Sequence, residues 1–337
     1  MSSGFVLVDK PGGPTSHDVV ARLRRRLATR RVGHAGTLDP MATGLLVCAF
    51  GQATRLLSYL TAHDKTYEAM IRFGMMTSTD DAAGEVTTAG GADDFDPQAL
   101  ASAARRWTGE VDQIPATVSA IKVDGKRAHA RVRAGETVEL APRRVRIDRI
   151  DLGEPVEQVV PGQGGDLNVV DVPVTVTCSA GTYIRALARD LGADLGLGAH
   201  LTALRRTASG PLNVAEADVV GEDLFDDGPV STHTVASIIS RFLPTRQISA
   251  DEIVHVSHGR PLALEVTGTT ALVDEAGSLL ALYRPSAPGI ATAERVFAAA
   301  TSSKEQARSV GSTGDADDAS HRPPIVDPEA ESEGTAR

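Results

Sequence analysis

The chain has 337 residues, of which 42% are hydrophobic and only 4% aromatic, and its formal net charge at pH 7 is −10. This length predicts two domains, or one large and one small, around a core of valine, leucine and alanine. No apolar run is long enough to span a bilayer, and no signal-peptide pattern opens the chain. Cys48 and Cys178 lie far apart among apolar residues, which indicates buried free thiols. We therefore expect a cytoplasmic protein.

The charge is unevenly distributed along the chain. Residues 301–337 hold eight acidic and four basic residues and are rich in serine, glycine and proline, so we expect a disordered acidic tail. Basic residues gather in two other stretches: Arg22, Arg24, Arg25, Arg26, Arg30 and Arg31, and then Lys122, Lys126, Arg127, Arg131, Arg133, Arg143, Arg144 and Arg146. Such runs are usually solvated surfaces, but phosphate binding depends on local rather than global charge. An RNA-binding surface is therefore an open alternative.

Hydrophobic periodicity predicts the elements of the N-terminal half. Residues 5–8 form a short apolar strand, and a helix begins at Thr15 or Ser16, both good N-cap residues. The apolar residues of this helix recur at helical spacing on one side, while arginines occupy the other. The pattern then predicts a strand at 45–50, a short helix at 53–60, a strand at 67–73 and a loop at 77–96.

The next predicted helix opens at Asp96-Pro97, because proline is favoured at the first helical position. Residues 114–147 are polar and basic. An alternating strand at 172–178 leads into a helix whose apolar residues lie between 184 and 195. Arg185 falls in the first turn of this helix, where a cation opposes the helix dipole. It is therefore either a tolerated surface residue or a functional one.

A small α+β module is predicted after Thr245, where the pattern changes. Ser249-Ala250-Asp251-Glu252 is a capping-box signature for a helix that stops at Gly259. Two strands follow, at 270–273 and 279–283. These boundaries divide the chain into three predicted parts, at 1–240, 245–298 and 301–337.

Residues 33–44, GHAGTLDPMATG, are the segment richest in candidate chemistry. They combine one carboxylate, Asp39, and one imidazole, His34, with three glycines that allow tight turns and close approach to a ligand. Pro40 disfavours helix at the preceding residue, so we expect Asp39 in an extended, exposed pose. On local chemistry alone, an aspartate in such a loop more often stabilises its own turn than takes part in catalysis. The loop leaves both interpretations open.

Several segments in a fixed order indicate a known family. They are FVLVDKP at 5–11 with Thr15-Ser16, the 33–44 loop, DKTY at 64–67 and CSAGTYIR at 178–185, with LRR at 204–206 after them. Together they resemble the TruB family of bacterial tRNA pseudouridine synthases over residues 4–215, and more weakly to 295. Any one of these motifs is weak, but the ordered set is specific.

The resemblance implies an α+β pseudouridine-synthase fold, in which helices flank a mixed, largely antiparallel central sheet. It implies an RNA-clamping insertion at 114–147 within a catalytic domain at 1–240. The module at 245–298 resembles a PUA-like RNA-binding domain, α+β or β-barrel in form. The implied substrate is uridine 55 in the T arm of tRNA, and the implied reaction needs no metal and no cofactor. A single RNA clamp predicts a monomer.

The resemblance also assigns three catalytic residues. Asp39 is the nucleophile or the ribose-side base, two roles that the sequence leaves open. Arg185 would keep Asp39 ionised and oriented, because a guanidinium group is always charged and binds carboxylates in bidentate fashion. Tyr67 would stack on the target base and take part in removal of the C5 proton, although a tyrosine on an alternating strand is more often a core residue.

Further residues are implied to bind the RNA, whose target base must be flipped out of its stack. His34 would fill the vacated stack, and Tyr183 and Leu204 would line the uracil pocket. The implied contacts to the RNA backbone are Lys10, Arg31, Lys122, Lys126 and Arg127.

Three other interpretations stand beside this one. The chain could be a noncatalytic tRNA-binding protein or folding chaperone that keeps the shell of a synthase, although an intact Asp39, Tyr67 and Arg185 argue against it. It could instead be a synthase that modifies another RNA. A carboxylate-based hydrolase would pair Asp39 with a second acid, but Asp80 and Asp81 lie in the predicted loop without a partner pattern.

Overall fold

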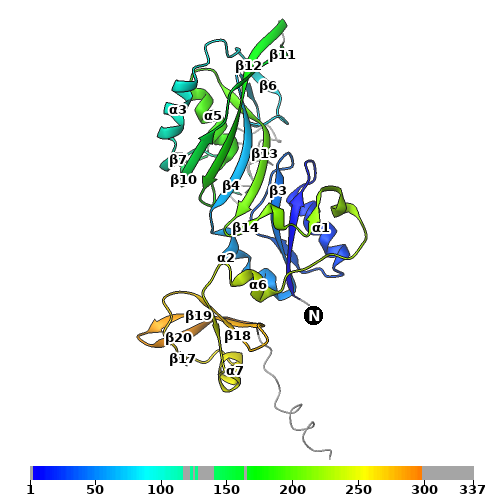
Figure 1. The fold of residues 1–337 in the computed structure, drawn as a ribbon, viewed down its shortest axis with the longest axis vertical. Helices are drawn as coiled ribbons and strands as arrows, with labels where there is room; N and C mark the ends of the chain where they lie inside the picture. Colours follow the sequence, from blue (N-terminus) through cyan, green and yellow to red (C-terminus); the bar gives the residue numbers. More distant parts are fainter. Residues whose placement is uncertain (1–2, 117–121, 124–125, 128–139, 163–164, 298–337) are drawn as a thin grey trace, which may run out of the picture. The chain divides into compact units, whose positions relative to one another are not determined.

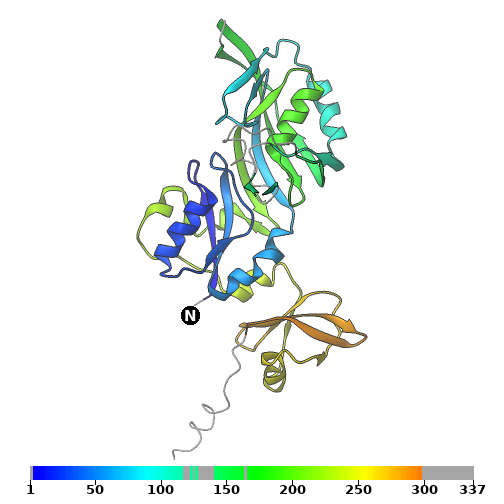
Figure 2. The same cartoon turned by 180° about the vertical axis from the view of Figure 1, so that it is seen from behind.

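The computed structural model describes residues 3–116, 122–123, 126–127, 140–162 and 165–297 (Figure 1, Figure 2). Met1–Ala298 forms one compact unit. The predicted acidic tail at 301–337 and much of the predicted insertion at 114–147 lie outside the described residues.

An 11-stranded sheet forms the larger part of this unit. Its main path is β15-β1-β3-β13-β4-β12-β10-β7, and β2, β11 and β14 pair at its sides. The pairs β1–β15 and β3–β13 are parallel, and the other pairs of the path are antiparallel, so the predicted mixed and largely antiparallel sheet is confirmed. The strands are β1 (Gly4–Lys10), β2 (Val32–His34), β3 (Thr43–Phe50), β4 (Lys65–Phe73), β7 (Gly109–Gln113), β10 (Arg143–Leu152), β11 (Val156–Gly162), β12 (Gly165–Cys178), β13 (Ala199–Ser209), β14 (Leu212–Asn213) and β15 (Val219–Val220).

Helices cover this sheet where the sequence places apolar stripes. α1 (Ser16–Arg26) begins at the N-cap Thr15, which forms a capping box with Asp18, and it buries Val19 and Leu23. α3 (Pro97–Arg106) and α5 (Ile184–Asp194) lie beside the part of the sheet that contains β4, β12 and β10 (Figure 1). The remaining helical segments are η1 (Gly51–Leu56), α2 (Leu57–Thr61), η2 (Val214–Glu216), η3 (Gly221–Phe225), α6 (Val235–Ile239) and α7 (Ala250–Ser257).

Two sequence predictions are wrong in the middle of the chain. β5 (Met75–Thr77) pairs with β6 (Val86–Ala89), so residues 77–96 are not all loop. Every residue of β6 is exposed, and the strand therefore lacks the alternation by which a half-buried strand is recognised. β10 begins at Arg143 and pairs with β7 and β12, so the last residues of the predicted insertion belong to the central sheet.

The predicted C-terminal α+β module is present as a five-stranded sheet with its own apolar core. Its helix α7 begins at Ser249, which forms the predicted capping box with Glu252. The hydroxyl of Tyr283 is buried in this module and donates to the carbonyl of Arg260 at 2.8 Å. The strands, in spatial order, are β16 (Thr245–Gln247), β18 (Thr270–Val273), β19 (Leu279–Ala287), β20 (Ile290–Val296) and β17 (Leu262–Ala263).

Part of the first basic cluster has a structural use. Arg22 Nε donates to the carbonyl of Leu224 at 3.1 Å, and Arg26 donates to Asp223 at 2.7 Å and to Gly228 at 3.0 Å. These arginines attach α1 to η3 and to the residues after it, because the last carbonyl groups of a helical segment and those of a turn need donors. The interpretation of the whole cluster as an RNA surface is wrong for these two side chains.

The core can be tested with one substitution made at two places. We expect Val172→Ala in β12, where the side chain is fully buried, to lower the free energy of unfolding by about 2 kcal/mol, from lost burial and the cavity left behind. Val159→Ala in β11, where the side chain is 63% exposed, should change it by less than about 0.5 kcal/mol. Denaturant titration measures both values, and equal losses would contradict the placement of the core.

Candidate active site

Residues from the distant motifs meet around one pocket with a volume of about 250 Å³. Asp39 reaches it from the 33–44 loop, Tyr67 from β4, Leu204 from β13, and Tyr183 and Arg185 from the start of α5. The structure thus brings together five of the residues that the sequence singled out, from segments separated by more than a hundred positions.

A larger groove, with a volume of about 700 Å³, shares Leu204 with this pocket. It runs along β4, β12 and β13 but contains neither Asp39 nor Arg185. We place the chemistry in the smaller pocket, because that pocket holds the carboxylate and the cation of the motifs.

The central contact of the pocket joins Asp39 to Arg185. The distance between Arg185 Nε and Asp39 Oδ2 is 2.9 Å. The Arg185 side chain is only 5% exposed, whereas the Asp39 side chain is 37% exposed. The carboxylate is therefore held from one side by a charge-assisted hydrogen bond and open to a ligand on the other.

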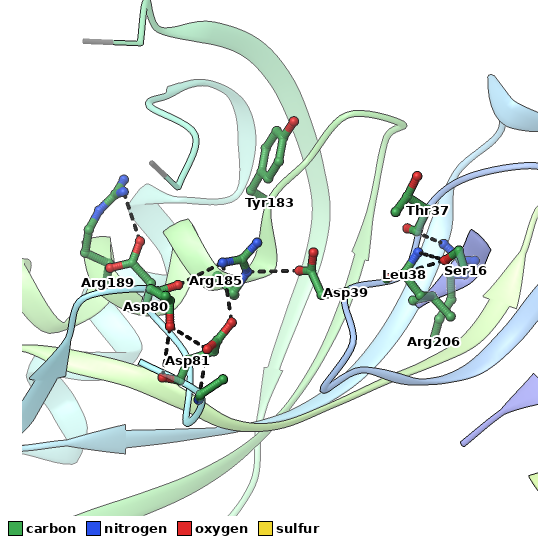
Figure 3. A network of polar contacts seen from close by, with 12 residues as sticks. Ser16, Thr37, Leu38, Asp39, Asp80, Asp81, Tyr183, Arg185, Arg189 and Arg206 are labelled. Atoms are coloured by element: carbon green, nitrogen blue, oxygen red, sulfur yellow. Dashed lines mark hydrogen bonds and ion pairs between the residues drawn. The ribbon is translucent and has the colours of Figure 1, made fainter. Parts of the chain in front are cut away.

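A second carboxylate, which the sequence analysis left without a partner, also contacts Arg185 (Figure 3). Asp81 Oδ2 lies 3.4 Å from Arg185 Nη1, and the same nitrogen donates to the carbonyl of Thr79 at 2.8 Å. Asp81 is buried and accepts from the Thr79 hydroxyl at 2.6 Å and from the Ala83 amide at 3.0 Å. The sequence shows no partner pattern for Asp81, because its partner Arg185 lies on a distant helix.

The neighbouring Asp80 is tied to the same helix. Its carboxylate lies 3.4 Å from Arg189 Nη1, and its backbone φ of +59° is in the left-handed region that non-glycine residues rarely adopt. Burial raises the pKa of the Asp80 carboxyl, and the Arg189 guanidinium opposes that rise. This turn is thus bonded to α5 at two successive positions, and no local sequence signal predicts either pair.

The 33–44 loop is fixed from behind by a hydroxyl and a guanidinium group. Ser16 Oγ accepts from the Leu38 amide at 2.9 Å and donates to the Leu38 carbonyl at 3.0 Å. Arg206 is buried and donates to the carbonyls of Gly36, at 3.1 Å, and Leu45, at 2.7 Å. Gly44 has φ +100°, and a Cβ atom there would lie 2.2 Å from the Arg206 carbonyl oxygen, so this position requires glycine.

Lys10 was predicted to contact the RNA backbone, and the structure contradicts this. Its side chain is fully buried, and its ammonium group donates to the carbonyls of Pro11, Pro14 and Pro40 at 2.8, 2.9 and 3.2 Å. Three carbonyls take up the three donors of the ammonium group. Lys10 therefore fastens the loop that follows Asp39 rather than facing solvent.

The first turn of α5 is held by a buried amide that the sequence analysis missed. Gln113 Nε2 donates to the Tyr183 carbonyl at 3.0 Å, and the Tyr183 amide donates to Gln113 Oε1 at 2.8 Å. Tyr183 is the N-cap residue of α5 and has no side-chain cap of its own. Gln113 thus sets the start of the helix that carries Arg185.

Burial decides the protonation of the tyrosine hydroxyls at the pocket. It raises the pKa of Tyr67, against which the nearby Arg206 acts, and it raises the pKa of Tyr183. Both phenols are therefore neutral at physiological pH and can donate a hydrogen bond.

His34 lies at the end of β2, next to the loop, and is not among the residues that line the pocket. Its ring meets that of His17 edge-on, with centroids 5.7 Å apart. Burial lowers the pKa of His34, and the neighbouring His17 and Arg206 lower it further. A neutral, flat side chain at this position suits stacking better than ion pairing.

Arg31, a further predicted RNA contact, is not among the residues that line the pocket. Arg31 is exposed and its Nε donates to the Thr54 hydroxyl at 3.2 Å. Lys122, Lys126 and Arg127 lie on β8 (Lys122–Val123) and β9 (Lys126–Arg127), which pair with each other, and their side chains lie outside what the structure describes. Nowhere in the described ranges is a helix both long and apolar enough to cross a membrane.

Sequence comparisons agree with this geometry. A family model described as "TruB family pseudouridylate synthase (N terminal domain)" matches residues 24–184. Two further models follow it without overlap: "tRNA pseudouridylate synthase B C-terminal domain" at 185–241 and "tRNA Pseudouridine synthase II, C terminal" at 243–298. The last of these coincides with the module predicted to be PUA-like.

Relatives match over most of their length. A protein named tRNA pseudouridine synthase B from Cutibacterium acnes is 49% identical over 288 residues, which is 85% of this chain and 94% of the relative. One of the same name from Thermobifida fusca is 49% identical over 283 residues, which is 84% of this chain and 94% of the relative. A solved chain from "Crystal Structure of a Cbf5-Nop10-Gar1 Complex" superimposes with a TM-score of 0.61 at 25% identity, covering 88% of this chain and 85% of that one.

The fold and the site together define a pseudouridylate synthase, an enzyme that modifies RNA. Within that class, the chain belongs to the TruB family. The α+β pseudouridine-synthase fold implied by the sequence motifs is confirmed.

The second carboxylate at Arg185 yields a kinetic prediction. We expect Asp81→Asn to lower kcat for pseudouridine formation at least about tenfold, or about 1.4 kcal/mol in activation free energy. The reason is that the substitution removes the carboxylate charge opposite Arg185 Nη1, so that Arg185 orients Asp39 less firmly. KM should change little, because Asp81 does not line the pocket.

The matched control is Asp171→Asn, which removes the carboxylate from the Arg72–Asp171 pair, 2.7 Å apart on β4 and β12. Steady-state kinetics of both variants should separate them, with kcat unchanged in the control. The same kcat loss in both, or none in Asp81→Asn, would contradict a role for this carboxylate in the site.

Proposed function

We propose that the chain isomerises uridine 55 in the T loop of tRNA to pseudouridine. The observation that carries the proposal is the Asp39–Arg185 contact of 2.9 Å inside a pocket that also holds Tyr67 and Leu204. Relatives about half identical over nearly their whole length carry the name tRNA pseudouridine synthase B, which supports tRNA as the substrate. A cytoplasmic monomer is the corresponding expectation for the protein.

The reaction breaks the N1–C1′ bond of the target nucleotide, rotates the base and joins C5 to C1′. The C5 proton is lost and N1 gains one, so the product is an isomer and no electron acceptor, metal or nucleotide is consumed. The target base lies inside a stacked loop and must be flipped out to reach a pocket of this kind, which costs a few kcal/mol of stacking energy. His34, next to the Asp39 loop, is proposed to fill the space that the base leaves.

Asp39 is proposed to act at the ribose. Its carboxylate either attacks C1′ or removes the proton from C2′, and both routes need the exposed face that the structure gives it. Arg185 orients the carboxylate, because a fixed guanidinium opposite one oxygen leaves the other free to act. Asp81 in turn fixes Arg185, so the two carboxylates have different tasks.

Tyr67, Tyr183 and Leu204 are proposed to hold the base. The three side chains line the same pocket, and a flat ring can pack between aromatic and aliphatic side chains. Tyr67 is neutral and close to Asp39 and Arg206, which suits stacking and a part in removal of the C5 proton. Arg31, Lys122, Lys126 and Arg127 are proposed to contact the RNA backbone.

The catalytic assignment has a direct test. We expect Asp39→Asn to lower the rate of pseudouridine formation at least about 1,000-fold while tRNA affinity stays near that of the wild type. Mass mapping of the modified nucleoside in tRNA locates the product, and Asp166→Asn on the exposed end of β12 is the control. An unchanged yield with Asp39→Asn would favour another acid, and product at a different position would overturn the uridine 55 assignment.

The RNA-backbone assignment predicts a salt dependence. Affinity for tRNA should fall linearly on a logarithmic plot against salt concentration, and Arg31→Ala should make that slope shallower by about one unit. Arg149→Ala, at an exposed arginine of β10, is the control for a general loss of charge. A slope that does not respond to Arg31→Ala would remove Arg31 from the proposed contacts.

A further inference from the structure

Two buried cations line the pocket without a carboxylate partner. The side chains of Lys65 and Arg206 belong to residues only 6% and 1% exposed, and both residues border the pocket. Lys65 Nζ donates to the carbonyls of Thr61 and His63, each at 2.5 Å. Among the residues that the structure describes, no carboxylate oxygen lies within 4.0 Å of either cation.

The pocket therefore carries an excess of positive charge. Asp39 and Asp81 both lie against Arg185, and the neighbouring Asp64 is paired with Arg146 at 2.8 Å. Backbone carbonyls satisfy the donors of Lys65 and Arg206 but leave their full charges uncompensated. A buried charge without a counter-charge is costly, so its presence at a pocket indicates that a negative charge arrives there.

The proposed reaction supplies such a charge. Heterolytic cleavage of the N1–C1′ bond leaves the electron pair on N1, so the detached uracil is an anion. Asp39 loses its own negative charge in the same step, either as an ester on C1′ or as a carboxylic acid that holds the C2′ proton. Whichever route operates, one negative charge moves from Asp39 to the base.

We propose that Lys65 and Arg206 form an anion-holding wall that stabilises the detached uracil anion and retains it while it rotates. The inference rests on the proposed function and names the chemical state in which the pocket holds the base. In Figure 3 Asp39 lies between Arg185 on one side and the group of Ser16, Thr37 and Arg206 on the other. The charge thus leaves the Arg185 side and is received where Lys65, Tyr67 and Arg206 line the pocket.

The step that rejoins the base to the sugar involves the same groups. C5 of the anion forms the new bond to C1′ and displaces the Asp39 carboxylate, or adds to C1′ while Asp39 returns its proton to C2′. Loss of the C5 proton and protonation of N1 complete the isomer. Arg206 keeps its charge throughout, and burial lowers the pKa of Lys65 only to about 8, so at pH 7 most of its molecules carry the charge as well.

A phosphate of the RNA backbone is the other anion that such a pocket could take. The two cations are almost wholly covered, however, and their donors end on carbonyls behind the loop and at the end of α2. A backbone phosphodiester concentrates its single charge on two non-bridging oxygens, which need free donors at close range, whereas the delocalised charge of a planar base is stabilised by the potential of the buried charges. The observations therefore favour the base.

The test compares two planar pyrimidine rings that differ in charge and in one exocyclic oxygen. Uracil is neutral at pH 7, and barbiturate, its 6-oxo analogue, is an anion. We expect the full-length protein to bind barbiturate at least about tenfold more tightly than uracil by calorimetry, because the pocket is built for charge. Lys65→Met should remove most of that preference, and Arg149→Met, at an exposed arginine, should leave it intact.

Arg206 also shapes the loop, so its replacement acts on the structure as well as on the charge. Arg206→Lys, which keeps the charge, is therefore compared with Arg206→Met only if both variants have melting temperatures near that of the wild type. Equal binding of the two rings, no detectable barbiturate binding, or a preference that survives Lys65→Met would overturn the proposal. Inorganic phosphate that binds as tightly as barbiturate and competes with it would assign the excess charge to the RNA backbone instead.

The outcome is separable from that of the proposed function. Pseudouridine mapping in tRNA is carried out on the same preparations. A Lys65-dependent preference for barbiturate without modification of uridine 55 would support the proposed anion-holding wall and contradict uridine 55 as the substrate. Modification of uridine 55 without a preference for barbiturate would support uridine 55 as the substrate and contradict the proposed wall.

Discussion

The Arg185 guanidinium is the group on which the geometry of the site depends, since it joins three separate segments of chain. It contacts Asp39 of the 33–44 loop, Asp81 and the Thr79 carbonyl of a distant turn, and it is carried by the first turn of α5. A guanidinium buried without these acceptors would lose its hydration uncompensated, at a cost of several kcal/mol. The position of the reactive carboxylate therefore follows from the requirements of a buried cation, and not from the loop alone.

Backbone carbonyls, and not only carboxylates, receive the buried cations around the site. Lys10, Lys65 and Arg206 all end on carbonyl oxygens, and Arg22 and Arg26 do so at the other side of α1. These contacts supply donors to carbonyls of the loops, such as those of Pro11 and Gly36, and to carbonyls at the ends of helical segments, such as that of Thr61. A count of the basic residues in the sequence therefore overestimates the positive charge on the surface that faces RNA. Some of these residues place their charge in the interior of the protein instead.

The sequence predicted those helices and strands whose signal lies within their own residues. The helix start at Thr15 or Ser16, the capping box at Ser249 and the alternation along β4 were predicted correctly, because each signal lies within a few positions. The β5–β6 hairpin was missed, since β6 is exposed throughout and shows no period. The site and its Asp39–Arg185 pair were predicted through family motifs, whereas the bonds made by Asp81, Gln113 and Lys10 were not foreseen. Asp39 and Arg185 are 146 positions apart, and no pattern in one segment encodes a partner in another.

The movement of charge in the proposed reaction explains why the pocket contains Lys65 and Arg206 in addition to Arg185. If Arg185 alone served both Asp39 and the base, the movement of negative charge away from Asp39 would separate it from its only counter-charge. Lys65 and Arg206 lie at other positions on the pocket wall, so in the proposed reaction the negative charge would move from one fixed cation to another. Fixed dipoles and charges that need not reorient during the reaction are what lower a barrier most effectively. Both proposed routes for Asp39, attack on carbon and removal of a proton, neutralise its carboxylate, so the proposed wall of Lys65 and Arg206 has the same task in each.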